Sequence, residues 1–292
     1  MKEKIQSQGM TTQKNTFGYC AEQVRRQDHD RFLTVLFAPQ ELRDDLFALY
    51  AFNQELARIR ETVSEPVLGE IRLQWWREAI DEIYDGAPRK HEVVDALAKA
   101  VRTHNLPREI FHQIIESRGQ DIYDENPQNL GELIDYLRGT SGNIARLAAQ
   151  VLADGDTDLG QKAEDSGVAW GLTGIVRAVP YHLSLRKVFL PADRMEKYGL
   201  SRDMLASPES RGPLGSVTGE LCEQATILLR EMRSERKDIP SRAHSLFLLN
   251  SLSRSYLKSL KKADYSPFNL QEKSDAFSRQ CRLMLDAFLK RV

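Results

Sequence analysis

Residues 41–62, ELRDDLFALYAFNQELARIRET, carry the pattern on which the fold prediction rests. Within this stretch, Leu46, Leu49, Asn53 and Leu56 follow one another at spacings of three and four residues. Such spacing places the side chains on one face of an α-helix, where they can pack against neighbouring elements. The stretch therefore predicts a long helix with a buried face.

Helix start and stop signals recur along the first half of the chain. Pro66 opens a helical run that closes at Gly86, with Ser64 as the expected cap, and Pro107 opens another run in the same way. An Asn-x-x-Glu pattern with the spacing of a capping box precedes the apolar stretch 133–137. These signals predict a succession of helices joined by short connections.

The second half continues the helical pattern around one irregular segment. Further helices are expected over residues 157–178, 215–236, 241–261 and 271–290. The segment 187–213 holds several prolines and glycines and is expected to be a long surface connection. No stretch alternates β-branched residues between hairpin turns, so the sequence predicts an all-α fold in a single domain.

Composition and charge narrow the function classes. Of 292 residues, 41% are hydrophobic and 28% are charged, which supplies enough apolar material for a large core. The formal net charge of -1 indicates neither a nucleic-acid footprint nor an acidic solvating tail. We therefore expect no nucleic-acid partner.

Cysteine usage and the first residues bear on the compartment. Cys20, Cys222 and Cys281 are far apart and form no CxxC pair, which favours a reducing environment. No run approaches the ~18 apolar residues of a membrane-spanning helix, and residues 1–16 lack the apolar core of a secretory signal. We expect residues 1–16 to be a disordered lead-in, and 17–292 to form the domain of a cytoplasmic protein.

Local groups of polar residues suggest little chemistry by themselves. His112 and Glu116 are four residues apart on one expected helix, a spacing that favours a surface pair over a metal pair. Asp121 and Asp124 share a helical face, and two acids alone indicate a solvated edge. No Ser/His/Asp or Cys/His arrangement stands out.

Three longer stretches, in order along the chain, resemble the motifs of the squalene/phytoene synthases. Residues 47–61, FALYAFNQELARIRE, look like the family's first motif, which leads into a DDxxD box. Residues 171–191, GLTGIVRAVPYHLSLRKVFLP, resemble the second motif, and 132–152 resemble the family's helix with a tyrosine and a Gly-rich bend. The family-like stretch covers roughly residues 19–285.

This resemblance implies an isoprenyl synthase-like helical bundle around a central cavity. Members of the family join two prenyl diphosphates after loss of diphosphate, and Mg²⁺ holds the leaving group. Because magnesium prefers hard oxygen ligands, carboxylates at i and i+4 on facing helices form a suitable clamp. The acidic boxes of this chain are therefore the positions that decide between an enzyme and a non-catalytic protein.

Both boxes depart from the family pattern. The aligned positions are Ala57, Arg58 and Glu61 in the first box, and Gly174, Ala178 and His182 in the second. Only Glu61 keeps a carboxylate, and Arg58 would repel a divalent cation by several kcal/mol at short range. Pro180 also interrupts a helix between the second-box positions. We therefore expect no magnesium, no other cofactor and no catalytic residue.

Basic side chains that map onto the box segments suggest a different ligand. Arg58, Arg177 and Lys187, together with Tyr136, are the candidate ligand-binding residues. A concave site that loses carboxylates and keeps cations attracts anions, which predicts an isoprenoid or anionic lipid bound without metal. The alternative for these cations is an ordinary solvated surface.

The wording of several short runs resembles one subgroup of the family. Ala51-Phe52-Asn53, Val63-Ser64-Glu65 and the run 186–191 look like the mitochondrial complex I assembly factor of this superfamily and its bacterial relatives. The resemblance implies a non-catalytic role in building the respiratory NADH dehydrogenase. Complex I subunits or assembly proteins are then the expected partners, with peripheral contact at the inner membrane. The alternative is an active Mg-dependent head-to-head prenyltransferase, a squalene or phytoene synthase using farnesyl or geranylgeranyl diphosphate.

Overall fold

The computed structural model describes residues 18–123, 125–153, 157–234, 239–270 and 276–289. Every regular element within these ranges is helical, so the all-α prediction is confirmed. The expected disordered segment 1–16 lies outside the described residues. The domain boundary at residue 17 stays a prediction.

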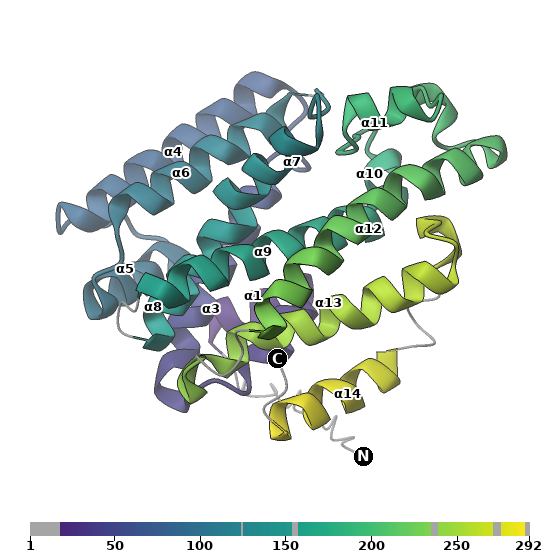
Figure 1. Ribbon diagram of the computed structural model, residues 1–292. Coiled ribbons are helices and arrows are strands. Elements are labelled where there is room, and N and C mark those ends of the chain that lie inside the picture. Colours follow the sequence, from purple (N-terminus) through teal and green to yellow (C-terminus); the bar gives the residue numbers. More distant parts are fainter. Residues whose placement is uncertain (1–17, 124, 154–156, 235–238, 271–275, 290–292) are drawn as a thin grey trace, which may run out of the picture.

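The elements follow one another in the order shown in Figure 1. The first half contains α1 (Tyr19–Gln27), α2 (His29–Val35), η1 (Gln40–Leu42), α3 (Arg43–Ala57), α4 (Pro66–Tyr84), α5 (Glu92–His104), α6 (Arg108–Gly119), η2 (Gln120–Ile122), α7 (Leu130–Leu137), η3 (Arg138–Gly142) and α8 (Asn143–Ala153). The second half contains α9 (Thr157–Arg177), α10 (Val179–Ser184), α11 (Ala192–Lys197), η4 (Arg202–Met204), η5 (Pro208–Ser210), α12 (Arg211–Ser234), η7 (Ser241–Ala243), α13 (His244–Lys262), η8 (Pro267–Asn269) and α14 (Ala276–Phe288).

Helix α9 lies in the middle of the bundle, between α8 on one side and α12 and α13 on the other (Figure 1). Two apolar clusters fill the interior. The first joins α1 to α6 and α8, and the second joins α7 with α10 to α12. Helices α9 and α13 contribute to both clusters, which ties the two halves of the bundle together.

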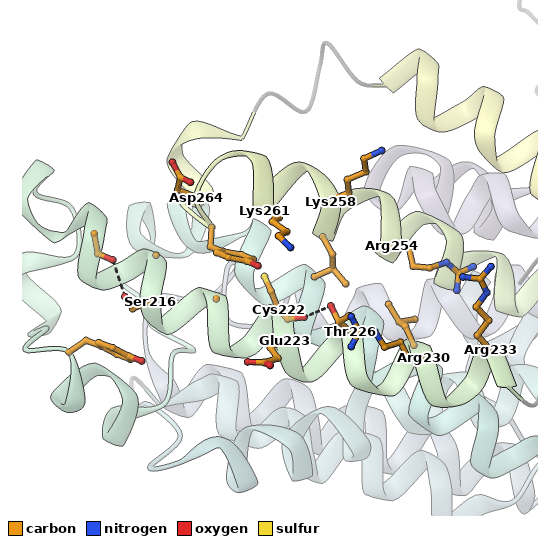
Figure 2. Close-up of a pocket in the computed structure, with 17 residues that line it drawn as sticks. Ser216, Cys222, Glu223, Thr226, Arg230, Arg233, Arg254, Lys258, Lys261 and Asp264 are labelled. Carbon is orange, nitrogen blue, oxygen red and sulfur yellow. Dashed lines mark hydrogen bonds between the residues drawn. The ribbon is translucent and has the colours of Figure 1, made fainter.

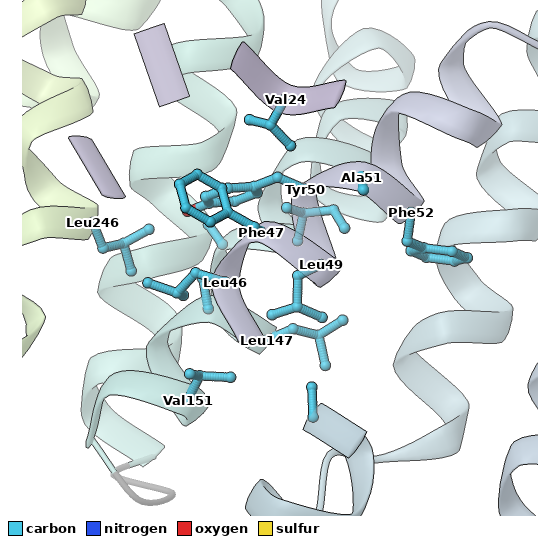
Figure 3. Close-up of a cluster of buried hydrophobic side chains, with 14 of the residues drawn as sticks. Val24, Leu46, Phe47, Leu49, Tyr50, Ala51, Phe52, Leu147, Val151 and Leu246 are labelled. Atoms are coloured by element: carbon cyan, nitrogen blue, oxygen red, sulfur yellow. The ribbon is translucent and has the colours of Figure 1, made fainter. Parts of the chain in front are cut away.

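The stretch that decides the fold is buried on more than one side. Leu46, Leu49, Phe52 and Leu56 of α3 are each 1% exposed or less. Figure 3 shows Leu46 and Leu49 among side chains from α1, α8 and α13, with Phe52 directed to another side. Residues 45–53 are all buried, so α3 is a central helix and not the one-faced helix that its spacing indicates.

The predicted helix starts are confirmed with one correction in the capping. Helix α4 begins at Pro66 as expected, but its N-cap residue is Glu65, not Ser64, and no side chain caps it. Before α7, the side chain of Asn129 accepts a hydrogen bond from the Glu132 amide at 3.0 Å. The Glu132 carboxylate accepts one from the amide of the residue preceding Asn129, at 2.7 Å.

The segment 187–213 is more than a surface connection. It contains α11, η4 and η5 and runs into the first residues of α12. Met195, Leu200 and Leu205 are buried in the second apolar cluster. The prolines and glycines break the helical pattern, but the apolar residues between them give the segment its own share of the core.

A π-helical turn, η3, joins α7 to α8 and receives α9 at very close range. A Cβ at Gly167 would collide with the carbonyl oxygen of Ser141 and lie 2.8 Å from the Cα of Gly142. A Cβ at Gly171 would lie 2.6 Å from a methyl of Leu137. Only glycine permits this approach, and it fixes the end of α9 that carries the second box.

Candidate functional site

The two box segments face each other across one cavity of about 370 Å³. From the first box, Ala57 and Glu61 line it, and from the second, Gly174, Ala178 and His182 do so. The structure therefore brings together five of the six aligned positions. The sixth, Arg58, does not line the cavity wall.

Pro180 shapes the second-box side of the cavity. Helix α9 ends at Arg177 and α10 begins at Val179 with the proline in its first turn, so the helix is interrupted as predicted. Beyond α10, Arg186 adopts the left-handed conformation with φ 56°, and the Lys187 amide donates to the His182 carbonyl at 2.9 Å. This turn brings Lys187 back to the cavity.

A hydrogen-bonded polar cluster forms another part of the wall. The Arg118 guanidinium contacts the Asp121 carboxylate at 3.0 Å and the Asn53 side-chain oxygen at 3.3 Å. The Tyr136 hydroxyl donates to Asp121 at 2.7 Å and accepts from Arg118 at 2.9 Å. Lys187 Nζ donates to the Asp121 backbone carbonyl at 2.9 Å. Asp121 is buried here, so its interpretation as a solvated edge was wrong, while Asp124 lies outside the described residues.

Burial affects the pKa values of Tyr136 and Arg118 in this cluster, and Arg118 keeps its charge. Burial raises the pKa of the Tyr136 hydroxyl above its ordinary value, so this group stays protonated. Burial opposes the charge of Arg118, but the adjacent Tyr136 and Asp121 hold its pKa above the ordinary value. One carboxylate oxygen of Asp121 contacts the charged Arg118, and the other accepts a hydrogen bond from the Tyr136 hydroxyl.

His182 occupies an apolar part of the cavity. Its ring lies 4.7 Å from the Phe189 ring, between centroids, and its Nδ1 is buried without a hydrogen-bond partner. Burial, reinforced by the Lys187 ammonium, lowers the pKa of His182 to about 4. The imidazole is therefore neutral at pH 7.

The four candidate ligand-binding residues divide into two pairs. Lys187 and Tyr136 line the cavity. Arg58 is about half exposed and lies 3.9 Å from Glu61, outside the wall. Arg177 faces another way, with its guanidinium 3.6 Å from Asp30 and stacked over a tyrosine ring of α13.

Two cations in the wall were missed by the sequence reasoning. Arg118 and Arg31 both line the cavity and are largely buried. Each pairs with an aspartate three residues away: Arg118 with Asp121 at 3.0 Å, and Arg31 with Asp28 at 2.7 Å. The i,i+3 spacing was visible in the sequence and is the signal that could have found them.

The donor set of the cavity does not fit magnesium. The second box offers no oxygen donor from a side chain, since Gly174 and Ala178 have none and His182 supplies a neutral imidazole. Of the two lining carboxylates, Asp121 is engaged by Arg118 at 3.0 Å, and Glu61 lies 3.9 Å from the Arg58 guanidinium. No group of three or more His, Cys, Asp or Glu side chains suited to a metal occurs in the part of the chain that the structure describes.

The other histidine candidate forms a surface pair of a different kind. His112 Nε2 lies 2.8 Å from the Asp81 carboxylate, which also pairs with Arg108, and not against Glu116. The expected pair of His112 with Glu116 is therefore wrong, and the acid comes from α4 instead.

The fold and the cavity define a class of protein. The model of the Squalene/phytoene synthase family matches residues 24–283, and the chain belongs to this family. A dehydrosqualene synthase structure matches with a TM-score of 0.82 at 20% identity, covering 94% of this chain and 96% of that one. A squalene synthase structure from Alicyclobacillus acidocaldarius matches with a TM-score of 0.75 at 20% identity, covering 85% and 94%. The isoprenyl synthase-like bundle is thereby shown.

Relatives at higher identity carry another name. The chain is 36% identical over 259 residues to the NADH dehydrogenase (ubiquinone) complex I, assembly factor 6, of Bos taurus, covering 88% of this chain and 78% of the relative. The human protein of the same name is 33% identical over 258 residues, with the same coverage. A phytoene synthase of Cereibacter sphaeroides is 25% identical over 224 residues, covering 74% and 62%.

The described helices were also compared with the length and hydropathy that a bilayer demands. None of those in the described ranges is both long and apolar enough to cross one.

Proposed function

We propose that this chain is a non-catalytic member of the squalene/phytoene synthase family that acts in assembly of respiratory complex I. Its cavity holds an isoprenoid or anionic ligand without metal. The observation that carries the non-catalytic part is the cavity itself, where the box segments face each other with Glu61 as their one carboxylate. A magnesium clamp needs several oxygen ligands from both sides.

The relatives support the assembly role. Two mammalian proteins named as complex I assembly factor 6 are 36% and 33% identical over 88% of this chain. We propose complex I subunits or other assembly proteins as its partners. The place of action is the cytoplasmic side, at the surface of the inner membrane where that enzyme is built.

The charges of the cavity support an anionic ligand. Its wall contains three cations, Arg31, Arg118 and Lys187, and two carboxylates, Glu61 and Asp121. Arg31 is paired with Asp28 and Arg118 with Asp121, so the side chain that the wall offers to an anionic head group is that of Lys187, beside the neutral His182. An anionic head group is attracted by this ammonium, and the apolar lining that includes Trp170, Ile175 and Phe189 suits a hydrocarbon chain.

An active prenyltransferase is the second candidate. It is favoured by the 25% identity to a phytoene synthase over 74% of this chain and by the retention of Glu61 in the cavity. Squalene or phytoene synthesis from farnesyl or geranylgeranyl diphosphate would then depend on an oxygen-ligand set other than the two boxes.

Deletion of the gene in the organism that encodes the chain tests the assembly role. We expect lower NADH:quinone activity in membranes and less assembled complex I on native gels, with both restored by the parent chain. Glu61→Ala should restore them as well, because no metal is used. Unchanged complex I in the deletion strain would refute the role, and a folded Glu61→Ala protein without function would revive the enzyme candidate.

The ligand is tested by thermal shift in EDTA with pyrophosphate, farnesyl diphosphate and a quinone analogue. We expect at least one of them to raise the melting temperature, and Lys187→Ala to reduce the rise because its ammonium lines the cavity. Arg58→Ala is the matched control, since Arg58 lies outside the wall. No shift at millimolar ligand would contradict the proposal.

A further inference from the structure

A second and larger hollow, of about 960 Å³, lies between α12 and α13. Its wall shares no residue with the box cavity among those described. Figure 2 shows α12 and α13 running side by side, with the side chains of both helices directed into the space between them. This α12–α13 groove is separate from the site described above.

Small residues line the α12 side of the groove, and two of the glycines let the chain after α13 come close: a Cβ at Gly215 would lie 2.7 Å from the Asp264 carbonyl oxygen, and one at Gly219 would lie 3.4 Å from the Tyr265 ring. Gly212, Gly215, Gly219 and Cys222 line it at spacings of three and four residues, with Thr226 following on the same face. From Cys222, beyond these close contacts, to the end of the groove at Arg233 is 11 residues, or roughly 16 Å of helix. A channel of that length can accommodate a long chain, and Leu229 and Leu257 add apolar wall.

Positive charge is concentrated in the groove. Its wall includes five basic side chains against two carboxylates. The basic residues are Arg230, Arg233, Arg254, Lys258 and Lys261, and the acidic ones are Glu223 and Asp264. Arg230, Arg233 and Arg254 stand together at one end (Figure 2), while Asp264 lies at the other. The groove therefore has a cationic end and a more neutral body.

Arg254 is the arginine of the cationic end whose electrostatic surroundings favour an added anion. Burial lowers the pKa of Arg254, and the nearby Arg233 and Arg282 lower it further, while Asp286 opposes them. Asp286 is itself held by Ser251 and lies 3.8 Å from Arg282. Among the described residues, no carboxylate lies within ion-pair distance of Arg254. Arg254 therefore feels the repulsion of two neighbouring guanidinium groups, those of Arg233 and Arg282, and an added anion would relieve it.

We propose that the α12–α13 groove binds a lipid phosphate, with the phosphate between Arg233 and Arg254 and the hydrocarbon chain along the small-residue face of α12. A phosphate can accept two parallel hydrogen bonds from one guanidinium group, so it matches an arginine in geometry as well as in charge. The chain covers the wall formed by Cys222, Leu229 and Leu257. The proposal does not depend on the function assigned to the box cavity.

Isothermal titration calorimetry of the whole chain tests the proposal with three probes, of which the two lipids are kept below their critical micelle concentrations. These are myristoyl lysophosphatidic acid, myristoyl lysophosphatidylcholine and inorganic phosphate. We expect the first to bind at least tenfold more tightly than the other two, because only it combines an accessible anionic phosphate with the chain. Equal affinity for the two lipids would overturn the role of the arginines, and equal affinity for inorganic phosphate would overturn the role of the chain.

Variants locate the site. Arg254→Gln and Arg233→Gln should each weaken binding of the lysophosphatidic acid at least tenfold. Because Arg233 is exposed on α12, its variant retains the fold even if loss of the partly buried Arg254 does not. Thr226→Phe, which fills the groove, should weaken binding similarly, while the exposed Lys262→Gln on α13, outside the groove, should change it less than twofold. Parent-like binding by both Arg233→Gln and Thr226→Phe would place the ligand elsewhere and refute the proposal.

Discussion

His182 should make the stability of the protein fall in mild acid. In the unfolded chain the imidazole has its ordinary pKa of 6.5, whereas burial beside Lys187 lowers the pKa to about 4 in the folded chain. As pH falls below 6.5, the imidazole becomes protonated in the unfolded chain but stays neutral in the folded chain. The folded state therefore loses stability down to pH 4, where its own imidazole begins to protonate.

The size of the effect follows from the two pKa values. Between pH 8 and pH 5, the linkage relation gives a loss of about 2 kcal/mol in the free energy of unfolding from this one group. His182→Phe removes the titration and keeps a ring against Phe189. It also removes the Nδ1 atom that is buried without a partner. Tyr181→Phe, one residue away, is the matched control, because its titration lies far above this pH range.

Urea unfolding followed by circular dichroism at pH 8 and pH 5 measures the effect. Other groups titrate in every variant, so the informative quantity is the difference between proteins. We expect the parent and Tyr181→Phe to lose about 2 kcal/mol more than His182→Phe over this interval. An equal loss in all three proteins would refute a buried, neutral His182 and the apolar cavity wall around it.

Two further predictions concern the framework of the cavity, and both use urea unfolding at pH 7. Asp121→Asn should destabilise the protein by about 3 kcal/mol, because it leaves Arg118 buried without its carboxylate. Asp135→Asn, in an exposed ion pair, is the control and should cost less than about 0.5 kcal/mol. Equal costs for the two variants would contradict a buried ion pair at Asp121. Gly167→Ala should destabilise by at least about 2 kcal/mol, because its Cβ has no room against η3. Gly160→Ala, in open space on the same helix, should be neutral or stabilising, and a tolerated Gly167→Ala would show that α9 lies farther from η3.

Local signals predicted the helices well because helix ends are determined by a few residues. Pro66 starts α4 and Asn129 caps α7, as expected from their types alone. Helix α9, expected over 157–178, spans Thr157–Arg177. The burial of α3 on several sides was not predictable, because it depends on which distant helices surround it. Phe52, for example, packs against Trp76 and Phe111 from α4 and α6.

The site was predicted in part for a related reason. The box segments were aligned correctly enough to place Lys187 and Tyr136 at the cavity, but not to say which way each arginine faces. Arg177 precedes the cavity-lining Ala178 by one residue, which turns its side chain by about 100° around the helix axis. It therefore reaches Asp30. Helical phase relative to the cavity requires the packed structure.

The buried pair Arg118–Asp121 was missed because its meaning depends on tertiary context. The i,i+3 spacing exists in the sequence, but such pairs are usually exposed and weak. Here η2 follows the end of α6, and Asp121 within it accepts a hydrogen bond from the hydroxyl of Tyr136 on α7. Only this contact with Tyr136 shows that the Arg118–Asp121 pair belongs to the cavity wall and not to a solvated helix end.

The central claim, that the cavity has no catalytic metal clamp, is tested most directly by product formation. Purified chain is incubated with labelled farnesyl or geranylgeranyl diphosphate and Mg²⁺ or Mn²⁺, and squalene, phytoene and released pyrophosphate are measured against a heat-killed control. We predict no product above that control, because the second box supplies no oxygen ligand at Gly174, Ala178 or His182. Squalene or phytoene formed above the control, and lost in Glu61→Ala, would contradict the account and identify an enzyme.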